Sequence, residues 1–522
     1  MDEKKKVTKA AGLMSIATFI SRISGYIKDM ILATIFGASG ITDAFFIAFR
    51  IPNLLRELFA EGSMSAAFVP VFTEYLVKKG KAEAKQIASV VFNSLLLILT
   101  VICLLGILFA PYIVSVIAPG FMKDPEKFSL TINLTKIMFP FLIFISLAAL
   151  CMGILNSIRS FFIPAVAPVF LNLSIMACAV FLAPEFSVPL LAIALGVTIG
   201  GAIQFAVQIP PLIKNGFGFK PLFSFSHPAL RKMLTLLGPS IVGMGVVQIN
   251  IFLSTIFVSY LASGSATYLY YAMRLIHFPI GIFGVAMATA ILPSLSEHAV
   301  KKDTGALRDT FSFALRLLFF VTIPAMAGLI ALSEPIVNLL FQRGHFSYDA
   351  TVGTAYALLF YSSGLWAFVG ARVVVSTFYS MQDTKTPVKI AGLSILTNII
   401  CSLIFMGPLK HGGLALANSM GSAVNFLVLF LLLRKRLVRV DGKNILWSFA
   451  KISFASFIMG FTGWLIIRGD MWKEGGRLIE KAFILSGVIA LCIAIYLLIM
   501  HLVKSEEMKY LLKIYKERKA KP

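Results

Sequence analysis

The sequence predicts an all-α membrane protein that crosses the bilayer many times. Hydrophobic residues make up 58% of the 522 positions and charged residues only 14%, against about 25% charged residues in ordinary soluble domains. Mean hydropathy is +0.89. The apolar runs are about twenty residues long, which suits membrane-spanning helices; a β-barrel would show alternating segments of about ten residues.

These runs predict about fourteen transmembrane helices. The basic N-terminus followed by an apolar run resembles a signal peptide, but Arg22 lies within the run and no small-residue cleavage site follows, so we interpret it as the first span. The expected spans are 10–36, 43–76, 87–118, 130–156, 162–183, 188–213, 231–262, 266–298, 310–333, 348–380, 386–407, 412–434, 446–467 and 481–503.

The distribution of Lys and Arg predicts the orientation. With the N-terminus inside, the inner segments carry about thirty Lys and Arg and the outer ones about seven, as the positive-inside rule requires. We therefore expect both termini in the cytoplasm. This bias accounts for most of the net charge of +23, and the short basic loops argue against nucleic-acid binding.

The chain also repeats itself. FIAFR (46–50) resembles YYAMR (270–274), and AFVPVFTEY (67–75) resembles AILPSLSEH (290–298). The offset of about 223–224 residues equals six helices, so the two copies cross the membrane in the same direction. We expect two parallel six-helix lobes around a central cavity, an architecture suited to a transporter that works by alternating access. The expected parts are an N-terminal lobe at 1–220, a C-terminal lobe at 221–440, and two extra helices with a basic tail at 441–522.

Several charged side chains lie inside these spans, where each costs at least about 2.5 kcal/mol at the bilayer centre. They are Arg22, Lys28 and Asp29 in the first span, Asp43, Arg50, Arg56, Glu57 and Glu61 in the second, Arg274 in the eighth and Arg372 in the tenth. Pairing of Arg50 with Glu57 or Glu61 is one interpretation, and charges that merely bridge helices are another. Because Arg22, Lys28 and Arg274 have no evident partner nearby in the sequence, we expect these three, with Arg56, to line a hydrated cavity that binds phosphate or pyrophosphate.

No cofactor or metal site is predicted. The five cysteines fall in apolar spans and the six histidines are scattered without ligand spacing. There is no GxxxxGK[ST] phosphate loop, so ATP hydrolysis is not expected. A coupling ion (Na⁺, H⁺ or Cl⁻) cannot be assigned.

Three quoted stretches carry a family resemblance. SRISGYIKDMILATIFGASGITDAFFIAFRIPNLLRELFAEGSMSAAFVPVF (21–72), YYAMRLIHFPIGIFGVAMATAILPSLS (270–296) and FYSMQDTKTPVKIA (378–391) resemble the MurJ (MviN) lipid II flippases, within the multidrug, oligosaccharidyl-lipid and polysaccharide exporter superfamily. The resemblance implies a protein of the bacterial inner membrane that moves undecaprenyl-pyrophosphate-linked peptidoglycan precursor, lipid II, from the inner to the outer leaflet. It also implies contact with membrane lipids and, as a possibility, with cell-wall synthesis proteins.

The same resemblance implies which residues bind substrate. The family's essential cavity arginines correspond to Arg22, Lys28, Arg56 and Arg274, with Lys28 departing from the usual arginine. Supporting or gating roles are expected for Asp29, Asp43, Arg50, Glu57, Glu61 and Arg372. No catalytic residue is expected.

Two other functions compete. A flippase for another polyprenyl-pyrophosphate-linked oligosaccharide would use the same cationic cavity. A membrane enzyme acting on polyprenyl phosphates, with Glu57 or Asp29 as base, would need a metal-binding acidic cluster that the sequence does not show. A drug–cation antiporter is disfavoured because its cavity should be acidic.

Overall fold

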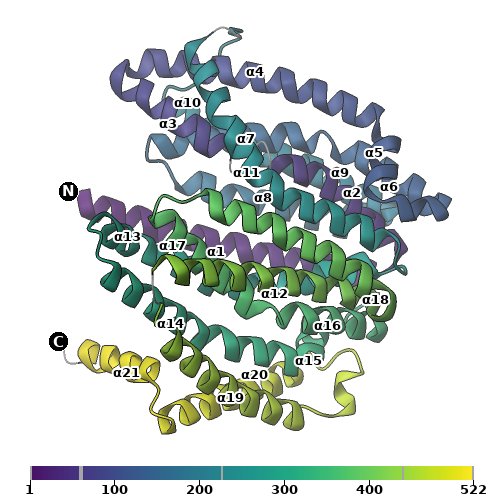
Figure 1. Cartoon of the computed structure of the whole chain (residues 1–522). Coiled ribbons are helices and arrows are strands. Elements are labelled where there is room, and N and C mark those ends of the chain that lie inside the picture. Colours follow the sequence, from purple (N-terminus) through teal and green to yellow (C-terminus); the bar gives the residue numbers. More distant parts are fainter. Residues whose placement is uncertain (1–2, 58–62, 225–226, 438–439, 520–522) are drawn as a thin grey trace. The chain divides into compact units, whose positions relative to one another are not determined.

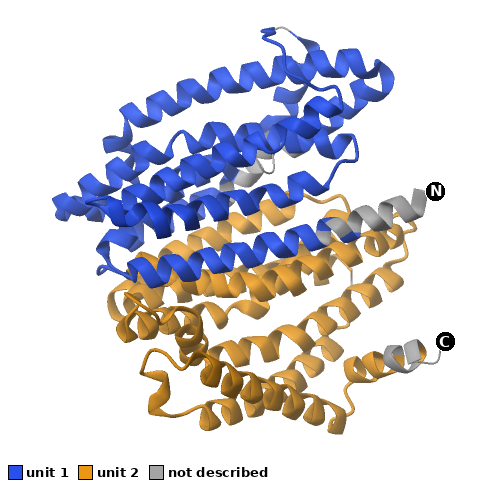
Figure 2. Cartoon of the chain, turned by 180° about the vertical axis from the view of Figure 1, so that it is seen from behind, with its two compact units in different colours: residues 1–264 blue, residues 265–522 orange. Residues whose placement is uncertain are grey.

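The chain folds into helices, as predicted. The computed structural model describes residues 3–57, 63–224, 227–437 and 440–519, and within these ranges it contains no β-strand. The helices form two compact units, residues 1–264 and 265–522 (Figure 1; Figure 2). The all-α membrane class is therefore confirmed.

Unit 1 contains the first eleven α-helices. Prolines at the first helical positions start several of them, since the missing N–H has no intrahelical partner there and the fixed φ suits a helix. Examples are Pro125, which follows the N-cap Asp124, and Pro228. The helices are α1 (Glu3–Phe36), α2 (Gly40–Arg56), α3 (Ser63–Lys78), α4 (Gly80–Leu108), α5 (Ala110–Ile117), α6 (Pro125–Met138), α7 (Phe141–Ser157), α8 (Phe162–Ala177), α9 (Pro189–Ala206), α10 (Ile209–Lys214) and α11 (Pro228–Ser259), with short turns η2 (Pro119–Lys123), η3 (Cys178–Leu182) and η4 (Ala183–Glu185).

Unit 2 contains the remaining helices. Aspartate and serine caps begin two of them: Asp303 accepts the N–H of Ala306, and Ser347 accepts that of Ala350. The elements are α12 (Ser265–Pro279), the π-helical η5 (Ile280–Val285), α13 (Ala286–Val300), α14 (Thr304–Ala331), α15 (Ser333–Phe341), α16 (Tyr348–Ser362), α17 (Leu365–Ser380), α18 (Lys385–Arg436), α19 (Gly442–Ile466), η6 (Asp470–Trp472), α20 (Leu478–Leu502) and α21 (Glu506–Lys519).

The sequence repeat reappears in the breaks of the helices. The fourth predicted span divides into α6 and α7, and the tenth divides at the corresponding place into α16 and α17. The chain then turns through a left-handed residue in both copies, Arg159 (φ 64°) and Gln382 (φ 61°), which are 223 residues apart. Positions that need the same unusual backbone at the same offset are strong support for an internal repeat.

The number of transmembrane helices is less clear-cut than their positions. Among the described residues, nine helices are long and apolar enough to span a membrane, or ten if the bent pair α16 and α17 is one span. The element α18 alone contains two predicted spans, 386–407 and 412–434, separated by the non-helical Lys410. The predicted number of fourteen transmembrane helices therefore stays a prediction.

The seventh predicted span, α11, belongs to unit 1. Lys232 near its start forms an ion pair with Glu74 of α3 at 2.6 Å. The segment before it is attached to α4, where the Asn93 side chain donates to the carbonyls of Lys220 and Leu222. The compact units thus divide at residue 264, whereas the repeat divides the chain near residue 220.

The other end of α11 is held by the turn η2. The N–H of Gly120 donates to Ser259 Oγ at 3.0 Å. A Cβ at position 120 would lie 2.2 Å from the Ser259 carbonyl oxygen, so only glycine permits this approach.

The two extra helices α19 and α20 pack on α14 in unit 2. Phe449 of α19 stacks edge-on against Phe319 with ring centroids 5.4 Å apart, and Tyr496 of α20 donates its hydroxyl to the Phe320 carbonyl at 2.7 Å. The loop between them is held by Asn338 of α15, which donates to the Trp472 carbonyl at 2.6 Å and accepts from the buried Lys481 of α20 at 3.0 Å. The predicted addition to the repeat is therefore a packed part of unit 2.

Candidate functional site

In unit 1, helix α1 carries three of the predicted site residues. Arg22 is exposed, whereas Lys28 and Asp29 are buried and form an ion pair at 3.1 Å. The expectation that Lys28 has no nearby partner is thus wrong, because the adjacent carboxylate supplies one. Contact with α8 holds this part of α1, since the Asn172 side chain donates to Ser24 Oγ at 2.9 Å.

Helix α2 carries a second group of charged side chains. Arg56 donates through Nε to Asn53 Oδ1 at 2.9 Å, and its terminal nitrogen lies 3.8 Å from Glu57 Oε1. Glu57 also accepts from Asn53 Nδ2 at 3.2 Å and from Gln248 of α11 at 2.7 Å. These contacts orient a guanidinium whose side chain is 20% exposed.

Arg50, one turn and a half earlier, also reaches α11. Its terminal nitrogen donates to Thr255 Oγ1 at 2.9 Å. Arg50 and Glu57 are seven residues apart on α2, and their partners Thr255 and Gln248 are seven residues apart on α11. The residue number rises along α2 where it falls along α11. Seven residues are close to two helical turns, so α2 and α11 run antiparallel with both pairs on facing sides.

Asp43 lies at the start of α2 and continues this antiparallel alignment. Its Oδ2 accepts the Gly264 N–H at 2.7 Å and lies 3.3 Å from Nζ of Lys127 on α6. Both side chains are nearly fully buried, and Lys127 Nζ also lies 3.9 Å from the centroid of the Phe121 ring. Asp43 therefore connects α2, α6 and the end of the α11 segment.

In unit 2, the predicted residues lie on α12 and α17. Arg274 is half-buried on α12 and Arg372 is exposed on α17. A π-helical segment, η5, follows α12, and such segments are frequent at functional sites. Gly284 of η5 lies against Val369 and the Arg372 stem of α17, since a Cβ there would be 3.0 Å from Val369 Cγ1 and 3.4 Å from Arg372 Cδ.

The structure thus places the predicted residues in both units. Glu61 lies outside the described residues. Residues that the sequence analysis missed supply most of the polar contacts: Asn53, Lys127, Asn172, Gln248 and Thr255. The seven-residue spacing shared by Arg50/Glu57 and Gln248/Thr255 is the pattern that could have predicted two of them.

Metal binding has little support in the described part of the chain. No group of three or more His, Cys, Asp or Glu there could hold a metal ion. The five cysteines are free and lie in apolar surroundings. What the spans do contain is a set of basic side chains oriented by amides and carboxylates, which suits binding of an anion more than acid–base or metal chemistry.

Comparisons with known proteins agree with this chemistry. The family described as "Lipid II flippase MurJ" matches residues 32–486. A "Probable lipid II flippase MurJ" of Vibrio cholerae is 36% identical over 504 residues, covering 95% of this chain and 96% of the relative. A "Lipid II flippase MurJ" of Burkholderia cenocepacia is 36% identical over 485 residues, covering 92% and 94%.

Solved structures give the same result. "Lipid II flippase MurJ, inward closed conformation" aligns with a TM-score of 0.78 and 31% identity, covering 94% of this chain and 98% of that one. An inward-facing multidrug transporter of the MATE family aligns with a TM-score of 0.67 at 15% identity, which shows a shared fold alone. A match over most of the chain, in both sequence and fold, places this protein in the family of MurJ lipid II flippases.

Proposed function

We propose that this protein moves lipid II, the undecaprenyl-pyrophosphate-linked peptidoglycan precursor, from the inner to the outer leaflet of the bacterial cytoplasmic membrane. The match to MurJ flippases over residues 32–486 carries the proposal. The chain acts as a transporter and catalyses no reaction. Its substrate and the surrounding membrane lipids are its partners.

The physical difficulty is the head group. A pyrophosphate with its sugars and peptide cannot enter hydrocarbon without substitute solvation, whereas the polyprenyl tail can stay in the lipid. Basic side chains within the spans supply such solvation. We propose that Arg22, Lys28, Arg56 and Arg274 bind the pyrophosphate, and that their guanidinium forks, where present, engage two phosphate oxygens at once.

The acidic and remaining basic residues support this site. Asp29 beside Lys28 and Glu57 beside Arg56 reduce the cost of keeping the cations in an apolar segment before substrate arrives. Arg50, Asp43 and Arg372 act through helix–helix contacts in their own units. Glu61 is proposed for the same group from its place in the sequence.

Transport proceeds by alternating access. Binding of the head group on the inner side favours a state in which the site closes inward, and reopening outward releases it. The two lobes are residues 1–220 and 221–440, with 441–522 as an addition, and both termini lie in the cytoplasm. Any net charge moved couples the step to the membrane potential at about 2.3 kcal/mol per charge per 100 mV, with no bound cofactor. A coupling ion, where transport uses one, would be Na⁺, H⁺ or Cl⁻.

The decisive experiment measures which leaflet holds lipid II after the protein is depleted from cells. Depletion should trap the precursor in the inner leaflet, and re-expression of the wild-type chain should restore its appearance outside. Outer-leaflet precursor appearing at a normal rate without the protein would exclude the proposed function.

A further inference from the structure

The C-terminal helix α21 leaves the last predicted span at a sharp turn. Helix α20 ends at Leu502, and Lys504 adopts a left-handed backbone with φ 54°. Ser505 is buried, and its hydroxyl accepts the Met508 N–H at 3.2 Å, which caps the first turn of α21. The chain therefore starts a new helix directly beside the end of a membrane-spanning segment.

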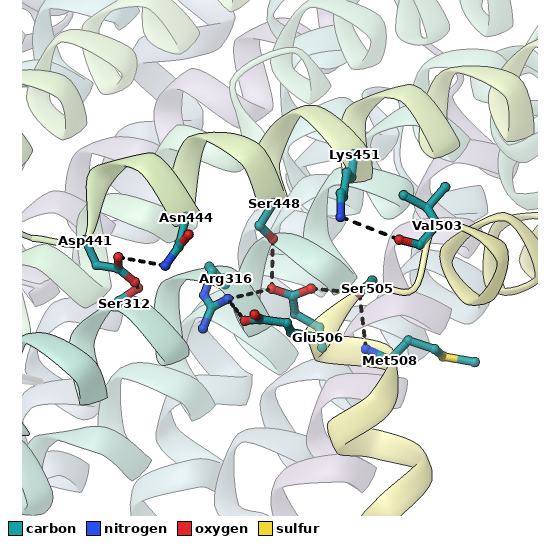
Figure 3. Close-up of polar contacts among 11 residues, drawn as sticks. Ser312, Arg316, Asp441, Asn444, Ser448, Lys451, Val503, Ser505, Glu506 and Met508 are labelled. Atoms are coloured by element: carbon teal, nitrogen blue, oxygen red, sulfur yellow. Dashed lines mark hydrogen bonds and ion pairs between the residues drawn. The ribbon is translucent and has the colours of Figure 1, made fainter.

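The first turn of α21 is fixed to two other helices (Figure 3). Glu507, only 3% exposed, accepts from Ser448 of α19 at 2.9 Å and lies 3.6 Å from Arg316 of α14. Arg316 also pairs with Glu506. The Tyr510 ring meets Phe313 of α14 edge-on at 4.8 Å. These contacts hold the helix at one end of unit 2.

Beyond this attachment, the helix has two distinct faces. Tyr510 and Leu511 are 43% and 38% exposed, so apolar surface is left uncovered. Lys509 and Lys513 are exposed one turn apart on another side, and Lys516 continues this spacing in the sequence. Lys513 also lies 4.0 Å from the exposed Glu517, a type of pair that contributes little to stability.

We infer that α21 lies in the membrane interface and binds the head groups of anionic phospholipids. A helix with an uncovered apolar face and a lysine stripe has the composition of an interfacial helix, and its position after α20 puts a leaflet within reach. The lysines complement the negative charge of that leaflet, which the distribution of Lys and Arg predicts to be the cytoplasmic one. The attachment through Arg316, Glu506 and Glu507 fixes the apolar face toward the lipid.

The inference predicts that Leu511 is shielded only when anionic lipid is present. The full chain with Leu511→Cys, in nanodiscs of phosphatidylcholine alone or with roughly one third phosphatidylglycerol, is treated with uncharged N-ethylmaleimide. We expect the thiol to react about tenfold more slowly with phosphatidylglycerol. Since each lysine is worth about fivefold in membrane partitioning, a K509Q/K513Q/K516Q background should restore fast labelling.

A matched control separates burial from surface potential. Glu517→Cys lies on the same helix, about 120° around from Leu511, and experiences the same potential without entering the lipid. Its rate should change much less than that of Leu511→Cys. The wild-type chain, whose cysteines are all buried or half-buried, gives the background. Equal slowing at both positions, equal rates in both bilayers, or slowing that survives loss of the lysines would overturn the inference.

Discussion

Arg56 shows how a cation can be kept within an apolar span. Asn53 orients its Nε, Glu57 lies beside its terminal nitrogen, and Gln248 holds Glu57 from α11. Among the described residues, one neutral amide and one carboxylate contact the guanidinium, an arrangement compatible with binding of an anion.

Removal of the proposed phosphate contacts should stop transport. We expect Arg56→Ala combined with Arg274→Ala to abolish growth in cells that depend on this protein, with each single change lowering flipping about 10- to 100-fold. Arg56→Lys should be intermediate because it keeps the charge but loses the fork. Arg308→Ala, an exposed arginine paired with its neighbour Asp309, is the control that should transport normally. Full transport by the double variant would contradict the site.

Asp43 and Lys127 form a buried ion pair that joins α2 to α6. Lys127→Met removes the ammonium group 3.3 Å from the buried Asp43 carboxylate, which should cost about 3–5 kcal/mol. Asp43→Asn with Lys127→Met should be closer to wild type, since no uncompensated charge remains. Unfolding of the purified protein in detergent measures both. A double variant less stable than Lys127→Met alone would show that the charge pair is not the cause.

At the scale of elements, the close packing of η2 against the end of α11 depends on the lack of a side chain at Gly120. Gly120→Ala places a methyl group 2.2 Å from the Ser259 carbonyl oxygen, so we expect a loss of about 2 kcal/mol or more in the free energy of unfolding. Gly328→Ala in α14 meets nothing within 4 Å and should be neutral or stabilising by about 0.5–1 kcal/mol through helix propensity. The midpoint of thermal unfolding should therefore fall in Gly120→Ala and stay the same or rise in Gly328→Ala.

The attachment of α21 should respond to acid. The hydrogen bond and charge of Arg316 lower the pKa of Glu506 below its usual value. Because the pKa of Glu506 is lower in the folded state, the pair stabilises the attachment of α21 fully above the unfolded-state pKa of about 4.3. This stabilisation is lost as the pH falls through the folded-state pKa. Protease cleavage within α21 should therefore increase only below that range. In Arg316→Gln it should be already high at neutral pH and change less with acid; an unchanged cleavage profile in this variant would contradict the role of the pair.

At the scale of the whole molecule, the orientation can be tested directly. Lys79 follows α3 in a predicted inner loop, and Lys473 lies in the predicted outer loop between α19 and α20; both are exposed. A membrane-impermeant maleimide added to intact cells should label Lys473→Cys and leave Lys79→Cys unlabelled until the cells are lysed. The reverse pattern would invert the proposed topology.

Much of the fold could be predicted from the sequence, because the lengths of the apolar runs and the offset between the two repeats can be read directly from it. Helix covers most of each predicted span in the described residues, and the break between α6 and α7 recurs between α16 and α17. Placing α11 in unit 1 depends on contacts such as Lys232 with Glu74, which join residues far apart in the chain. Long-range contacts of this kind produce no repeating pattern that could be recognised in a single sequence.

The charged residues of the candidate site could be predicted from the sequence, but their hydrogen-bonding partners could not. The charged residues stood out because charge is rare in apolar spans, and that rarity is readable from composition. Their partners did not, because Asn53, Gln248 and Thr255 are ordinary polar residues whose importance depends on which helix faces them. The Lys28 and Asp29 pair was missed although the two residues are adjacent.

The two bridges from α2 to α11 constrain how this protein can move. Because Arg50 meets Thr255 and Glu57 meets Gln248 at one shared spacing, sliding either helix by a single turn would separate both pairs together. Sliding the two helices past each other therefore has to break both hydrogen bonds at once, whereas tilting them together breaks neither.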